Sequence, residues 1–238
     1  MKAEQRIMAD AASLIAAATE QFITVARSAI AKRGVFYVAL AGGSTPKGLY
    51  QMLATSPYSS RVDWSRVHLF FGDERCVLPN HDDSNFKMAS EAMTDALPIP
   101  EANVHRMPTE LGEATVIATR YAETMTEVLQ DQPFDLVLLG LGPDGHIASL
   151  FPDTPALTVT ESLTTALYVE KFSSWRVTMT YPVLNAARQV IVFIAGEAKA
   201  AIVKDISSDA VAGLPVQRLA PQGDYYWYMD AAAAGHVV

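Results

Sequence analysis

Short apolar runs, separated by polar or glycine-rich segments, recur along the whole chain. Their Val, Leu, Ile and Phe content is typical of strands, and their continuity indicates burial on both faces, as in a parallel sheet. The clearest runs are residues 35–40, 67–71, 134–139 and 189–194, and residues 176–180 form a more polar segment that also favours a strand. We therefore predict a strand over each of them.

Helical periodicity occupies the stretches between these runs. Residues 10–32 and 113–130 each place apolar side chains on one broad face, and Gly34 supplies a stop signal after the first. Shorter helices are predicted from residue 46 to about 54, over 85–94 and from 196–199 onward, with a helix or tail at 231–234. This alternation predicts an α/β fold, with a mostly parallel sheet and helices on both faces. Because no repeat or linker-like stretch interrupts the chain, we predict a single domain over residues 1–238.

Composition and charge exclude several classes of protein. With 50% hydrophobic and 18% charged residues, a sizeable core is expected and disorder is not. A net charge of −8 argues against a nucleic-acid partner or an acidic membrane surface, so an anionic ligand needs a local positive cluster. No apolar run approaches the roughly 20 residues of a membrane span, and the first residues lack a signal-peptide pattern. We therefore expect a cytoplasmic protein.

The apolar run at 134–139 leads into a loop rich in Gly and Pro that carries Asp144 and His146. In open α/β sheets, ligands bind beyond the carboxyl ends of the strands. An imidazole is neutral near pH 7 and suits general-base work, and a nearby carboxylate can orient it or bind a substrate hydroxyl. Asp144 and His146 are therefore the predicted catalytic residues.

The same loop also matches the spacing of a dinucleotide fingerprint, through Gly140, Gly142 and Gly145. That fingerprint requires a helix that opens directly on the third glycine. Pro152 and Pro155 prevent a long helix from starting there, so we favour catalysis over nucleotide binding.

A second glycine-rich turn, residues 41–46, follows the strand at 35–40 and opens a helix. Gly43 allows close backbone approach, and Ser44 or Thr45 can cap the helix. The exposed amides and the helix dipole favour an anion, naturally a phosphate. The alternative is a well-capped helix without a ligand.

Further candidates for an anion site lie elsewhere in the chain. Asp73 and Arg75 follow the strand at 67–71, where Arg75 can hold a phosphate through two hydrogen bonds or belong to a solvated loop. Arg176 and Lys199 contribute only if the fold brings them to the Gly43–Ser44 turn. The spacing of potential ligands predicts no metal site, and the nucleophile elbow is absent, so activated water is the predicted nucleophile.

Several segments share an order and spacing with one family. They are residues 40–46, 64–75, 83–85, 134–152, 176–185 and 196–200. Together they span nearly the whole chain and resemble the 6-phosphogluconolactonase family, in a wider group that includes glucosamine-6-phosphate deaminases. The resemblance implies a Rossmann-like sheet, no metal or organic cofactor, and a sugar-phosphate lactone as substrate. It implies hydrolysis of 6-phospho-D-glucono-1,5-lactone to 6-phosphogluconate in the oxidative pentose phosphate pathway.

The resemblance also implies roles for the candidate residues. Asp144 and His146 match the reacting end, and Asp73 matches a position that handles protons in the deaminases. The remaining matches contact the phosphate or the sugar: Gly43, Ser44 and Thr45 in the phosphate loop, with Arg75, Arg176 and Lys199 beyond it.

Other functions stay open at this point. A deaminase-like isomerase is the nearest alternative, but deaminases continue the Gly-Pro-Asp-Gly-His-Ile-Ala motif with Phe-Asn-Glu, whereas this chain has Ser149-Leu-Phe. Deaminases also usually have an aromatic residue at the position of Arg75. A non-catalytic sugar-phosphate sensor is the other alternative, although such regulators normally carry an added DNA-binding module. The assembly is expected to be a monomer or a weak dimer.

Overall fold

A twisted sheet of seven strands forms the centre of the protein, in a computed structural model that describes residues 3–208 and 211–235. All neighbouring strands in this sheet run parallel. Their spatial order is β1 (Glu4–Met8), β10 (Asp224–Asp230), β9 (Gln189–Ile194), β6 (Leu136–Gly140), β2 (Phe36–Leu40), β3 (Val67–Phe71) and β5 (Val104–His105). The first strand of the chain therefore pairs with the last, at one edge of the sheet.

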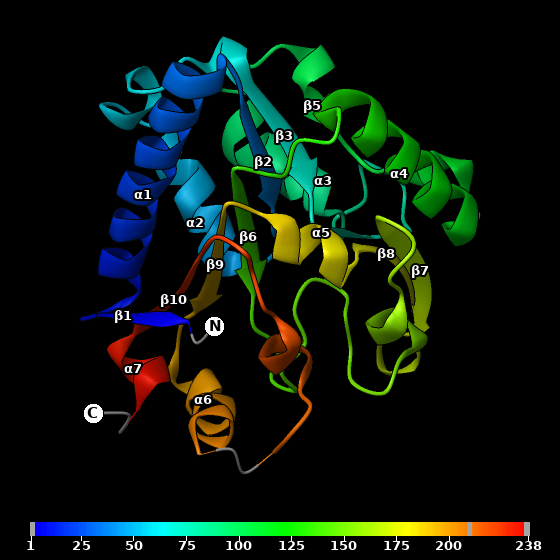
Figure 1. Cartoon of the computed structure of the whole chain (residues 1–238). Helices are drawn as coiled ribbons and strands as arrows, with labels where there is room; N and C mark the ends of the chain where they lie inside the picture. Colours follow the sequence, from blue (N-terminus) through cyan, green and yellow to red (C-terminus); the bar gives the residue numbers. More distant parts are fainter. Residues whose placement is uncertain (1–2, 209–210, 236–238) are drawn as a thin grey trace.

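Both faces of this sheet are covered, as the continuous apolar runs predict. Along β6, Leu136 and Leu138 face one apolar core, whereas Val137 and Leu139 face the other. The first core is completed by α1 (Ala11–Arg33), α2 (Ser44–Leu53) and α3 (Asn85–Ala89), which a short π-helical turn (Ser90–Thr94) extends. The second is completed by α4 (Ala114–Leu129), α5 (Tyr181–Ala186), α6 (Ala200–Ser207) and α7 (Ala231–Ala234). The predicted α/β fold with helices on both faces is confirmed (Figure 1).

A small antiparallel sheet, which sequence analysis did not predict, packs beside α4. It consists of β4 (Asp73–Arg75), β8 (Ser174–Met179) and β7 (Thr164–Val169), in that order. The strand predicted at 176–180 is confirmed as β8. It forms the centre of this second sheet and does not belong to the seven-stranded sheet. Figure 1 shows β7 and β8 on the α4 side, away from α1. The small sheet thus adds a wall beyond the carboxyl end of β3.

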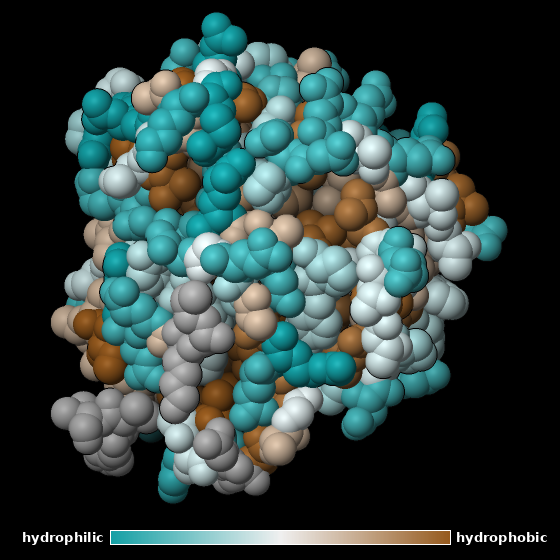
Figure 2. Space-filling view, viewed as in Figure 1, coloured by the Kyte–Doolittle hydropathy of each residue, from teal (hydrophilic) through white to brown (hydrophobic). Residues whose placement is uncertain are grey.

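The visible surface of the protein is mostly hydrophilic (Figure 2). Figure 2 shows hydrophilic residues over most of the visible face, with hydrophobic side chains in smaller patches between them. Within the described part of the chain, no helix has both the length and the apolar character needed to cross a membrane.

Candidate active site

A cavity of about 560 Å³ opens at the carboxyl ends of β2, β6 and β9, and β4 and β8 supply its remaining wall. This is the position at which open α/β sheets bind their ligands. The structure brings together residues that are far apart in the sequence. Those that line the cavity are Gly43, Ser44, Thr45, Asp73, Arg75, His146, Arg176 and Lys199. Asp144, the other predicted site residue, lies behind His146 and is not part of the lining.

The loop after β6 holds the imidazole of His146 against its own backbone. Asp144 Oδ1 lies 2.5 Å from His146 Nδ1, and the Gly142 amide donates to the His146 carbonyl. A Cβ atom on Gly142 would lie 1.9 Å from His146 Nδ1, so only glycine leaves room for the ring. The ring of Phe151 covers the imidazole with centroids 4.1 Å apart. These contacts fix the ring in one orientation.

The surroundings of His146 favour a neutral imidazole beside an ionised carboxylate, mainly because the imidazole is buried. Burial lowers the pKa of His146 and outweighs the opposing effect of Asp144. Burial also opposes ionisation of Asp144, but hydrogen bonds from Lys171 and His146 prevail and lower its pKa to about 2. Because an ionised Asp144 only accepts, we infer that His146 Nδ1 carries the proton and Nε2 is free to accept one.

Two arginines from the small sheet also line the cavity. Arg75 on β4 and Arg176 on β8 are direct cross-strand partners. The Nε atoms of both are buried and have no hydrogen-bond partner among the described residues, while Arg75 Nη1 donates to the Asp83 carbonyl at 2.5 Å. Burial lowers the pKa of Arg176, and the charge of Arg75 adds to that effect. Like charges in such a cross-strand pair destabilise the sheet, and a bound anion would offset this cost.

The glycine-rich turn after β2 meets the cavity at the N-terminus of α2. Gly43 has φ +103°, which favours glycine, and it occupies the N-cap position without a side-chain cap. The expectation that Ser44 or Thr45 caps this helix is therefore wrong, because both lie within its first turn. Both residues line the cavity.

Asp73, at the start of β4, is held as a hydrogen-bond acceptor. Ser149 Oγ donates to Asp73 Oδ2 at 2.6 Å, and Asn85 Nδ2 donates to the Asp73 carbonyl at 2.9 Å. Ser149 follows the loop of His146, so this contact joins the predicted catalytic loop to β4. Phe151 takes the position at which the deaminase pattern has Glu.

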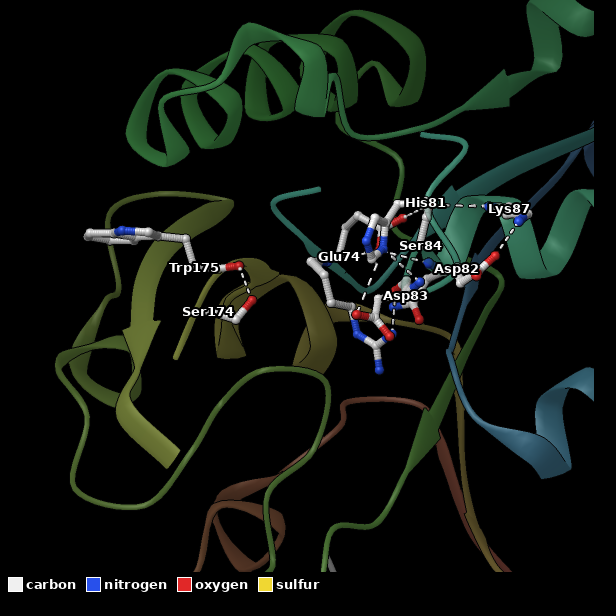
Figure 3. A network of polar contacts seen from close by, with 10 residues as sticks. Glu74, His81, Asp82, Asp83, Ser84, Lys87, Ser174 and Trp175 are labelled. Atoms are coloured by element: carbon white, nitrogen blue, oxygen red, sulfur yellow. Dashed lines mark hydrogen bonds and ion pairs between the residues drawn. The ribbon is translucent and has the colours of Figure 1, made fainter. Parts of the chain in front are cut away.

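Sequence analysis missed the role of Glu74, whose side chain is only 2% exposed. Its carboxylate accepts hydrogen bonds from the backbone amides of Arg75, Asn85 and Phe86 and from the hydroxyl of Ser84. Burial raises the pKa of Glu74 despite these bonds. Figure 3 shows Glu74 and Ser84 in one polar network with the segment that carries Asp82 and Asp83. Glu74 thereby anchors that segment to β4.

Lys199 completes the lining from the segment after β9. The Gly196 amide that starts this segment donates to Asp230 Oδ2 at 2.9 Å, and Asp230 also caps α7. Burial lowers the pKa of Lys199, and Asp144 opposes that shift. Within residues 3–208 and 211–235, no group of three or more His, Cys, Asp or Glu side chains is arranged to hold a metal ion.

Comparisons with known proteins show the family of this chain. The family model described as "Glucosamine-6-phosphate isomerases/6-phosphogluconolactonase" matches residues 9–227. A 6-phosphogluconolactonase from Nostoc sp. is 38% identical over 244 residues, covering 100% of this chain and 99% of the relative. A 6-phosphogluconolactonase from Synechocystis sp. is 42% identical over 212 residues and covers 86% of each chain.

Solved structures are similar over the whole chain. The 6-phosphogluconolactonase of Trypanosoma cruzi matches with a TM-score of 0.90 and 27% identity, covering 100% of this chain and 97% of that one. A monomeric glucosamine-6-phosphate deaminase matches with a TM-score of 0.81 but only 18% identity, covering 98% and 99%, which shows the shared fold alone. The chain belongs to the glucosamine-6-phosphate isomerase/6-phosphogluconolactonase family.

Proposed function

We propose that this protein hydrolyses 6-phospho-D-glucono-1,5-lactone to 6-phospho-D-gluconate, in the oxidative pentose phosphate pathway, with His146 as the base that activates water. The observation that carries the proposal is the meeting of His146 with the Arg75–Arg176 pair in one cavity. Hydrolysis of a phosphorylated lactone needs a base that activates water for attack on the carbonyl carbon. It also needs a positively charged site that binds the phosphate. The relatives named above support the same substrate.

The proposed reaction follows from the chemistry of the lactone. Its carbonyl carbon is already electrophilic, so water can attack C1 directly without a covalent enzyme intermediate. His146 Nε2 takes a proton from the attacking water and later returns it to the departing ring oxygen. Asp144 stabilises the imidazolium that exists between these two steps. Backbone amides or an arginine supply donors for the developing oxyanion.

The positive residues would hold the substrate in register for this attack. In the proposal, Arg75 and the backbone at Gly43 and Ser44 bind the phosphate. Arg176, Lys199 and the hydroxyl of Thr45 contact the phosphate or the sugar, and Asp73 accepts from a sugar hydroxyl. Fixing the distant phosphate lowers the entropy cost of placing C1 beside His146.

The remaining parts of the proposal concern the whole protein. We propose a cytoplasmic enzyme with one domain over residues 1–238, without a nucleic-acid or membrane partner. We expect a monomer or a weak dimer. Analytical ultracentrifugation at several protein concentrations tests this by measuring the molecular mass in solution. The net charge of −8 supports the lack of a nucleic-acid partner.

Freshly made phosphogluconolactone tests the function directly, because acid release can be compared with the spontaneous rate. We expect the purified protein to raise the rate far above this background. Glucosamine-6-phosphate serves as the competing substrate, and no ammonia release is expected from it. Ammonia release would favour the deaminase, and binding of 6-phosphogluconate without turnover of the lactone would favour a sensor.

A further inference from the structure

Lys171 lies next to the proposed catalytic pair, although nothing in its local sequence singles it out. It belongs to the short turn Glu170–Phe172, which joins β7 to β8. Its ammonium group contacts Asp144 Oδ2, whereas His146 Nδ1 contacts Asp144 Oδ1. Each oxygen of the carboxylate therefore has its own partner, and Asp144 bridges the ammonium group and the imidazole.

The same ammonium group also contacts the ring that covers the imidazole. Lys171 Nζ lies 4.7 Å from the ring centroid of Phe151 and 5.0 Å from that of Phe172. Such cation–π contacts are favourable at partly exposed sites. Phe151 in turn packs on His146. Lys171 thus touches both side chains that hold the imidazole, yet it is absent from the residues that line the cavity.

We propose that Lys171 is a positioning residue for His146, acting through Asp144 and Phe151 without touching the substrate. This inference deepens the proposed function and rests on it. The ammonium group favours the ionised form of Asp144 and occupies the oxygen that His146 does not use. The imidazole then stays in the tautomer with a proton on Nδ1, and Nε2 remains the free nitrogen. A carboxylate that holds a catalytic histidine in the correct tautomer has a large effect on kcat.

The charge of Lys171 also affects how readily His146 takes up a proton. Asp144, from the same loop, and Asp73, from β4, favour the imidazolium, whereas Lys171 opposes it. Lys199, from the segment after β9, acts on Asp144. Without the positive charge of Lys171, the negative charges of Asp144 and Asp73 are opposed less. The pKa of His146 should therefore rise. Activity falls at low pH as His146 becomes protonated. This fall, the acidic limb of the pH–activity profile, should therefore move to higher pH.

This inference predicts distinct behaviour for two variants. Lys171→Met removes the charge and keeps much of the apolar length, whereas Lys171→Arg keeps the charge. We expect Lys171→Met to lower kcat by about 10- to 100-fold, on the scale of a slightly misplaced catalytic group, with a smaller change in KM. Its acidic limb should move to higher pH, while Lys171→Arg should keep most of the activity and an unshifted limb. Lys204→Met, on an exposed position of α6, is the control and should match the unmodified protein.

A second measurement does not depend on turnover. Imidazole ¹⁵N NMR of the substrate-free protein, with the His146 signal assigned through His146→Gln, reports both tautomer and protonation midpoint. The midpoint should rise in Lys171→Met, or in Lys171→Gln if the Met variant does not fold. An unchanged midpoint and tautomer, or an Arg variant as impaired as the Met variant, would overturn the inference. If the unmodified protein does not hydrolyse the lactone, the proposed function fails, while the NMR titration still tests the action of Lys171 on His146.

Discussion

Arg75 and Arg176 face each other across the ladder between β4 and β8, and the Nε atoms of both are buried without a partner among the described residues. Two guanidinium groups in this arrangement repel each other, and both arginines line the cavity. An anion between them would receive charge-assisted hydrogen bonds and relieve the repulsion. This relationship is the structural basis for placing the phosphate at this wall.

Replacement of Arg75 by alanine should therefore weaken catalysis in a way that depends on the phosphate. Charge-assisted hydrogen bonds contribute about 1.5–3 kcal/mol. Arg75→Ala should lower kcat/KM for the phosphorylated lactone by roughly 10- to 150-fold, since 1.4 kcal/mol is tenfold. The loss should be much smaller with unphosphorylated gluconolactone. Arg120→Ala, on the exposed face of α4, is the control. An equal loss on both substrates would mean that Arg75 supports the fold or acts at the lactone end.

The pH dependence of activity should reflect the environment of His146. A general base works only when unprotonated, so kcat/KM falls as the pH falls through the pKa of His146. Burial lowers that pKa below its ordinary value of 6.5, so the midpoint of the acidic limb should lie below 6.5. The profile is measured with the spontaneous rate subtracted at each pH. A midpoint above 6.5 would contradict this account of the site.

Gly142 should be needed for the position of the imidazole. An alanine there would place its Cβ 1.9 Å from His146 Nδ1 and 2.1 Å from Cε1. The ring must move away from Asp144, so Gly142→Ala should lower kcat by up to about 10²-fold, with the fold retained. Gly140→Ala is the comparison variant, since its Cβ would meet no protein atom within 4 Å; because Gly140 also lines the cavity, KM is measured for both variants. Similar kcat values for the two variants would show that the ring tolerates displacement.

Activity should also be independent of metal ions. The proposed steps use His146 and water, and no cluster of three or more potential ligands occurs in the described part of the chain. Prolonged dialysis against a chelator should leave the rate of lactone hydrolysis intact. Loss of activity that a divalent ion restores would require a different mechanism.

The α/β fold could be predicted from the sequence because its central strands are continuous runs of Val, Leu, Ile and Phe. β10 was missed because its segment, Asp224–Asp230, is built from Tyr and Trp, although aromatic residues also favour strands. β1 is short and polar, with Arg6 and Glu4 among its residues, so it carries no clear apolar pattern. β7 follows a Thr-rich segment that gave no clear strand signal.

The candidate site was predictable where its residues act through local patterns. Asp144 and His146 share one loop, and Gly43 lies in a turn with a recognisable glycine-rich composition. The pairing of Arg75 with Arg176 depends on the register of two strands that are far apart in the chain, which periodicity does not reveal. Lys171 depends in the same way on how the β7–β8 turn folds back over Asp144. Long-range register and loop placement are therefore what the sequence left open.

The most direct test of the central claim is kcat for hydrolysis of freshly made 6-phosphogluconolactone by His146→Ala beside the unmodified protein. Loss of general-base catalysis should lower kcat by roughly 10²- to 10⁴-fold, with a smaller effect on substrate binding. Circular dichroism and binding of 6-phosphogluconate show whether the variant remains folded. A folded, ligand-binding variant with near-normal kcat would contradict the role of His146 and with it the proposed mechanism.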